Sequence, residues 1–116
     1  MREIKFRAWD TKARYMVAEY FQIKNTPKHY ILLQYTGLKD KNGKEIWEGD
    51  VIDGGGFGPT VVRIGEFQNK ESYDGREEGV GVYFESVRGG EITGTWLFKG
   101  APIIGNIYEN PELLKV

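Results

Sequence analysis

The residues that could carry chemistry in this chain are few. There is one histidine, His29, and there is no cysteine. A histidine-based metal cluster or a Ser/His/Asp triad needs an imidazole held by suitable partners, and the sequence offers no second histidine. The lack of cysteine excludes thiol catalysis, cysteine metal ligands and disulfides. We therefore interpret His29 as a surface residue at the end of a loop.

Acidic residues and glycines give no better catalytic candidate. Asp50 and Asp53 flank a short apolar strand, with Glu48 nearby, and paired acids can act as general acid and base. Their odd spacing places them on opposite faces of a strand, so we interpret them as solvated turn residues. The glycines at 54–58 lack the lysine and the helix of a phosphate-binding loop, and residues 40–43 lack calcium-loop spacing. The sequence predicts no enzyme, no cofactor and no metal site.

Aromatic residues beside basic ones form the remaining candidate site. Trp9 and Tyr15 bracket a connection that contains Lys12 and Arg14. Proteins bind single-stranded nucleic acid in this way, with bases stacked on rings and phosphates near cations. The same pattern arises on any antiparallel sheet with one solvated face. The candidate binding surface, extended by lysines around the next turn, consists of Trp9, Lys12, Arg14, Tyr15, Lys39, Lys41 and Lys44.

Charge is divided unevenly along the chain, although the net charge is −1. Residues 1–47 hold ten Lys and Arg against five Asp and Glu, and residues 48–116 hold six against twelve. This division is typical of a nucleic-acid-binding face or of an acid–base match between subunits, and it also occurs on ordinary solvated surfaces. Because the net charge is slightly negative, we expect any nucleic-acid binding to be weak and salt-sensitive.

Short alternating runs and 16 glycines indicate a mostly β protein. Residues 2–9, 15–23 and 30–35 are expected to form an N-terminal antiparallel sheet. In the first strand, apolar residues at 4, 6 and 8 point to one side and charged residues at 3, 5 and 7 to the other. Strands at 50–53, 60–68, 80–88, 91–99 and 103–107 fit a small β-barrel. Asn110-Pro111-Glu112 predicts the start of a helical turn that ends at Leu114.

Glycine positions predict the turns. Asn42-Gly43 favours a charged, solvent-facing type I′ hairpin turn, because both residues tolerate the positive φ that this turn requires. Gly89-Gly90 predicts a second two-residue turn. The glycine-rich stretch 54–59 is expected to be a loop with an exposed Phe57. At least two of the three tryptophans, at 9, 47 and 96, are expected in the core.

Three segments carry a resemblance to a known family. They are MREIKFRAWD at 1–10, QYTGLKDKNGKEIWEGDVI at 34–52 and IGNIYENPEL at 104–113. Together and in this order they resemble the YopX-like family of small phage and prophage proteins. The resemblance implies an SH3-like small β-barrel with an added N-terminal β segment. It implies no catalytic residue and no established biochemical function.

We expect one compact unit in two parts. Residues 1–49 form the antiparallel β segment with its Asn-Gly hairpin, and residues 50–116 form the SH3-like barrel with its C-terminal helical turn. The charged start and the lack of a long apolar run predict a protein of the bacterial cytoplasm without a membrane span. The leading hypothesis is a non-enzymatic binding module that contacts a host or phage protein and forms homo-oligomers. The alternative is a nucleic-acid-binding accessory protein that uses the basic N-terminal half.

Overall fold

A computed structural model describes residues 4–69, 77–92 and 101–115. Its strands are β1 (Phe6–Asp10), β2 (Tyr15–Tyr20), β3 (Tyr30–Lys39), β4 (Glu45–Trp47), β5 (Asp50–Asp53), β6 (Pro59–Asn69), β7 (Glu77–Ser86), β8 (Glu91–Ile92) and β9 (Ile103–Asn106). Short 3-10 helices join or follow them: η1 (Ile23–Asn25), η2 (Gly55–Phe57) and η3 (Pro111–Leu114).

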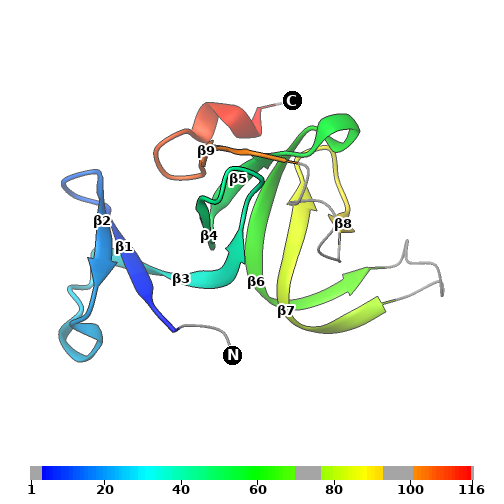
Figure 1. Cartoon of the computed structure of the whole chain (residues 1–116). Coiled ribbons are helices and arrows are strands. Elements are labelled where there is room, and N and C mark those ends of the chain that lie inside the picture. Colours follow the sequence, from blue (N-terminus) through cyan, green and yellow to red (C-terminus); the bar gives the residue numbers. More distant parts are fainter. Residues whose placement is uncertain (1–3, 70–76, 93–100, 116) are drawn as a thin grey trace.

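The described strands form two sheets, ordered β2-β1-β3-β4 and β8-β7-β6-β5-β9. The N-terminal sheet stands to one side of the second sheet, whose long strands β6 and β7 bend strongly (Figure 1). Gly65 and Gly81 face each other in the middle of this pair, and paired glycines permit such a bend. The second sheet therefore curls into a half-barrel. The predicted mostly β fold, with a small barrel and an N-terminal antiparallel segment, is confirmed.

The core draws on both sheets. Its fully or nearly fully buried cluster consists of Ile46, Ile52, Val62, Phe84 and Ala101. Ile46 belongs to β4 of the N-terminal sheet, so the two sheets share this core. Trp9 and Trp47 are also buried, which confirms that at least two tryptophans lie in the interior. Trp96 lies outside the described residues.

β1 turns its charged side, and not its apolar side, toward the barrel. The Arg7 guanidinium donates a 2.5 Å hydrogen bond to Asp50 of β5 and lies 5.3 Å from the centroid of the Trp47 ring. Trp9 is 6% exposed and stacks on Tyr108, with ring centroids 5.8 Å apart. These contacts attach the N-terminal sheet to the second sheet and to the turn after β9.

The opposite side of the N-terminal sheet points away from the barrel. Because Arg7 and Trp9 point inward, Phe6, Ala8 and Asp10 must point outward. Side chains paired with these three across β2 and β3 share their face. We call this surface the outer face. Its large apolar and aromatic members are the exposed Tyr15 and the half-buried Phe6, Val17, Tyr20, Tyr30 and Leu32, whereas Ala8 and Asp10 on the same face are buried.

Two predicted turns have a different geometry. The Gly43 N–H donates to the Asp40 carbonyl and the Asp40 N–H to the Lys44 carbonyl, which makes a longer loop than a type I′ turn. Gly43 has the expected positive φ, 79°, but Asn42 has not. This is the pattern of a type I turn followed by a left-handed glycine. The connection at Gly89-Gly90 has the same pattern, since it closes from Ser86 to Gly90.

Some predicted boundaries are also wrong. β2 ends at Tyr20, ahead of η1, and this leaves Phe21 77% exposed instead of in phase within a strand. β3 continues to Lys39, four residues beyond the predicted end. The predicted strand 91–99 is described only at β8, and its remainder lies outside the described residues. The C-terminal turn forms as η3, but the Asn110 side chain accepts the Asn106 N–H instead of capping the turn.

Candidate functional site

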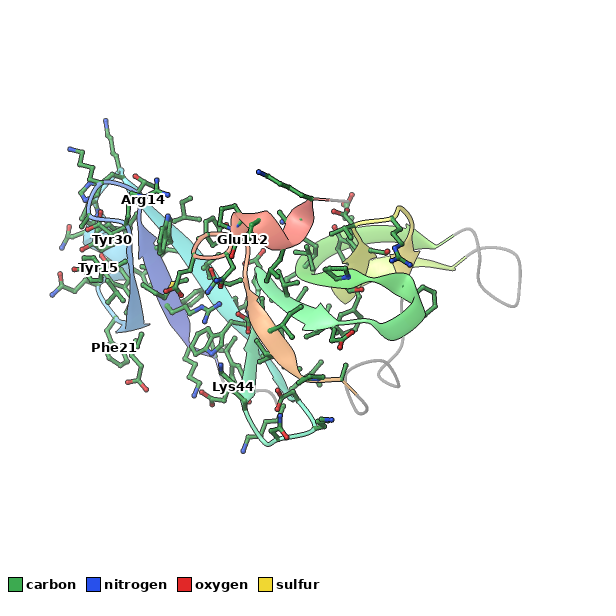
Figure 2. The ribbon with its side chains drawn as sticks, turned by 90° about the horizontal axis from the view of Figure 1, so that it is seen from above. Arg14, Tyr15, Phe21, Tyr30, Lys44 and Glu112 are labelled. Atoms are coloured by element: carbon green, nitrogen blue, oxygen red, sulfur yellow. The ribbon has the colours of Figure 1, made fainter. Side chains whose placement is uncertain are left out.

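Tyrosine rings gather on the outer face. The Tyr20 and Tyr30 rings meet edge to face with centroids 5.5 Å apart, and the His29 ring lies 4.9 Å from that of Tyr30. Tyr15 is 51% exposed. Desolvation and the neighbouring Tyr15 hydroxyl raise the pKa of Tyr30 above its ordinary value. Figure 2 shows Tyr15, Tyr30 and Phe21 on the side of the sheet away from the barrel.

Cations border the outer face at both ends of its strands. They are Lys12 and Arg14 in the β1–β2 turn, Lys24 in η1 and Lys28 before β3, all exposed. The Thr11 N–H donates to the His29 carbonyl at 3.0 Å, so the β1–β2 turn adjoins the start of β3. Glu19 of β2 is exposed in the same sheet. The outer face is therefore an aromatic surface with a mainly basic border.

The predicted binding surface is divided in the structure. Lys12, Arg14 and Tyr15 lie together, as expected. Trp9 does not join them, because strand alternation turns its ring inward onto Tyr108. The hairpin lysines at 39, 41 and 44 are exposed but belong to another region, and Figure 2 shows Arg14 and Lys44 on opposite sides of the molecule. The predicted residues thus form two separate basic groups and one buried ring.

Asp40 in the β3–β4 hairpin is buried, contrary to the prediction of a solvent-facing turn. One carboxylate oxygen accepts the N–H groups of Asn42 and Lys44 at 2.9 Å, and the other accepts the Ile103 N–H at 3.0 Å. Desolvation acts to raise the pKa of Asp40, but the three N–H donors and the Lys44 charge outweigh it and lower the pKa overall. Through these hydrogen bonds the Asp40 carboxylate connects the β3–β4 hairpin to the first residue of β9.

A polar cavity of about 570 Å³ opens between the N-terminal sheet and the second sheet. It lies on the inner side of β1, away from the outer face. The lining residues are Arg7, Lys44, Glu45, Trp47, Asp50, Ile103, Gly105, Asn106, Glu109 and Asn110. Lys5 neutralises Glu45 through a 2.5 Å ion pair. The cavity therefore has an aromatic and aliphatic wall with charged groups around it.

Asp50 is the buried charge of this cavity, at 3% exposure. Its carboxylate accepts hydrogen bonds from Arg7 and from the Trp47 N–H. Desolvation raises the pKa of Asp50 above its ordinary value, although Arg7 opposes the rise. The interpretation of Asp50 as a solvated turn residue is wrong. The available signal was its position directly before the apolar pair at 51–52, which marks a strand that enters the core.

The three segments that carry the family resemblance meet at this cavity. The first contributes Arg7, the central one Lys44 to Asp50, and the last Gly105 to Asn110. A Cβ on Gly105 would come within 2.5 Å of the Asn110 side chain, so only glycine fits this close approach. The segments are distant in sequence, and the fold brings them into one site.

Within the described ranges, no group of three His, Cys, Asp or Glu side chains is placed to hold a metal ion. None of the helices described is long and apolar enough to cross a membrane.

Comparison with known proteins agrees with this architecture. The crystal structure of protein EF1440 from Enterococcus faecalis is similar over 99% of this chain and 100% of that chain, with 25% sequence identity and a TM-score of 0.59. A search of curated proteins found no match. The family model described as YopX protein matches residues 17–115. The predicted resemblance is thereby confirmed, and the chain belongs to the YopX family.

Proposed function

We propose that this protein is a non-enzymatic binding module that acts through protein–protein contacts made by the outer face. The observation that supports this most directly is a tyrosine-rich surface that no described element covers (Figure 1, Figure 2). Exposed apolar patches mark interaction sites. Tyrosine is enriched in protein interfaces, because its ring gives a large contact area at a small cost in conformational entropy.

The border of the outer face favours an acidic partner. Lys12, Arg14, Lys24 and Lys28 would face carboxylates on such a surface, which increases the association rate and the specificity. A second copy of this chain is one source, since residues 48–116 carry an excess of Asp and Glu. The family resemblance supports a phage or prophage origin, and we place the activity in the cytoplasm of the bacterial host.

A photo-crosslinking experiment tests this proposal. The photoreactive amino acid benzoylphenylalanine replaces Tyr15 of the outer face or, as the control, Phe57 of η2, which is 42% exposed and lies between β5 and β6 of the second sheet. Both variants are expressed in the host and irradiated. We expect a defined protein adduct from position 15 and none of the same mass from position 57. Equal adducts from both positions, or none from position 15, would contradict the proposal.

Nucleic-acid binding is a second candidate, favoured by the cations around the tyrosine rings. Tyr15 would be the ring that stacks on the bases, because Trp9 is buried. A fluorescence titration with a mixed-sequence single strand tests this. Binding at about 50 mM salt should weaken tenfold or more by about 200 mM salt, and Tyr15→Ala should weaken it without changing the salt slope. Absence of binding at low salt would remove this candidate.

A further inference from the structure

We propose that the cavity between the two sheets binds a short unblocked peptide of about three residues in extended form. Its carboxylate end would lie at Lys44 and its ammonium end at Glu109. This site lies on the inner side of β1, and the inference does not depend on binding at the outer face.

The two ends of the cavity differ in charge. At one end, Lys44 acts on the nearby Asp40 and Asp50 carboxylates to lower their pKa values but makes no ion pair with any described residue, and Lys5 already neutralises Glu45. At the other end, Arg7 and Asp50 neutralise each other, and the Glu109 carboxylate accepts one hydrogen bond, from the Asn106 amide. A cation is therefore available at the first end and a carboxylate at the second. A ligand with opposite charges at its two ends matches this arrangement.

β9 gives the distance between these ends. The Lys44 N–H and the Ile103 N–H both donate to Asp40, so Lys44 lies beside the first residue of β9. Glu109 is held by Asn106, the last residue of β9. Four strand residues cover about 10 Å. An extended tripeptide also spans about 10 Å, which matches the separation of the two backbone positions from which the Lys44 and Glu109 side chains extend.

The walls suit an aliphatic side chain between the two charges. Trp47 and Ile103 line the cavity, and the Arg7 guanidinium lies over the Trp47 ring. The volume of about 570 Å³ is in the range of small-molecule sites, about 300–1,000 Å³. Arg7 donates one hydrogen bond, and its Nε has no acceptor among the described residues. The site is thus polar at both ends and apolar in its wall.

The test uses the tripeptide Ala-Leu-Ala in four forms: free, N-acetylated, C-amidated and blocked at both ends. Binding is measured by calorimetry and by shifts of the Trp47 and Gly105 amide signals in NMR spectra. We expect the free peptide to bind best, each block to weaken binding about threefold to tenfold, and leucine alone to bind more weakly. Equal binding of all four forms, or no shift at about 10 mM free peptide, would overturn the proposal.

Charge-removing variants locate the two ends. Lys44→Met should weaken the free and acetylated peptides but leave the amidated one unchanged, and Glu109→Gln should weaken the free and amidated peptides but leave the acetylated one unchanged. Matched controls are Lys41→Met, in the same hairpin, and Glu112→Gln, in η3, since both residues are exposed and neither lines the cavity. A loss of affinity in the controls as large as in the test variants would refute the assignment.

Discussion

Side-chain oxygens at strand ends hold the backbone of this protein in its turns. In each case the oxygen accepts the N–H of the residue two positions later. The accepting residues are Asp10, Asp40, Asp53, Ser86 and Asn106. Short polar side chains form such turns because they replace a backbone carbonyl. These side chains therefore have a structural role, including that of Asp40, which was expected to face solvent.

Asp40 provides the first prediction. Asp40→Ala removes the acceptor of three N–H groups and should lower the free energy of unfolding by about 2–4 kcal/mol. Asp40→Asn keeps one oxygen but turns an amide N–H toward that of Ile103, so it should cost about 1–3 kcal/mol. Urea unfolding measures both. Asp53→Asn is the control, because its exposed side chain accepts one bond, and a loss as large there would contradict this account.

The pKa of Asp40 adds a pH dependence. Because this pKa is lower in the folded state, its stabilisation is present above the unfolded value, about 3.9, and is lost as pH falls through the folded value. The difference in unfolding free energy between wild type and Asp40→Asn should therefore shrink in acid. A difference that does not change between neutral and strongly acidic pH would be inconsistent with a lowered pKa.

Asp50 contributes a pH dependence of stability in the opposite direction to that of Asp40. Burial raises its pKa, so its contribution to stability is fully present below the unfolded value and is lost as pH rises through the folded value. Arg7→Met would leave this carboxylate unpaired and should cost about 3–5 kcal/mol near neutral pH, and less in acid, where Asp50 is protonated. Urea unfolding at several pH values measures this. If the loss of unfolding free energy caused by Arg7→Met became larger in acid, the Arg7–Asp50 pair would not have this role.

At the scale of elements, this protein needs glycine for two different reasons. Gly43 has φ 79°, and a Cβ added there would meet no atom within 4 Å, so only backbone strain opposes substitution. Gly105 has an ordinary φ, but the space that its side chain would occupy is filled by Asn110 and Leu113. The same residue type thus serves a turn in one hairpin and a close approach at the cavity.

Substitution of these glycines tests the distinction. Gly43→Val should lower the free energy of unfolding by about 1–2 kcal/mol through strain. Gly105→Ala should cost about 1–3 kcal/mol through overlap and should also disturb the hydrogen bond from the Asn106 N–H to Asn110. Gly56→Ala, with ordinary φ and open space, is the control and should be nearly neutral. Thermal unfolding ranks the three, and a neutral Gly105→Ala would contradict the close packing.

The elements themselves were largely predictable, and the site was not. Alternation and glycine located most strands of both sheets because these signals act within a few residues, but they did not predict β4, Glu45–Trp47, as a strand. The turn at Asn42-Gly43 was placed correctly but given the wrong type, since Asp40 and its bond to Ile103 favour a longer loop. Trp9 and Arg7 point inward because of contacts with Tyr108 and Asp50, and no local pattern reports a partner so distant in sequence.

At the scale of the whole molecule, the two halves of opposite charge predict self-association. The basic border of the outer face and the acidic excess of residues 48–116 favour a closed symmetric assembly. Light scattering at low salt should give a mass above the 13.3 kDa of one chain, and the mass should fall as salt screens the charges. A mass of one chain at high concentration and low salt would eliminate this prediction. Lys12→Glu with Arg14→Glu should weaken assembly, whereas Lys41→Glu should not.

The position of β9 has a consequence for folding during synthesis. β5 pairs with β6, which follows it directly in the chain. The other edge of β5 stays unpaired until β9 has been made, about fifty residues later. The β6–β7 hairpin can form early, because its contacts are close in sequence. While the ribosome makes the intervening residues, the nascent chain exposes an apolar strand edge, which is a site for misassembly. A chain truncated before Ile103 should therefore aggregate or recruit chaperones, and the last residues to emerge should complete the native sheet.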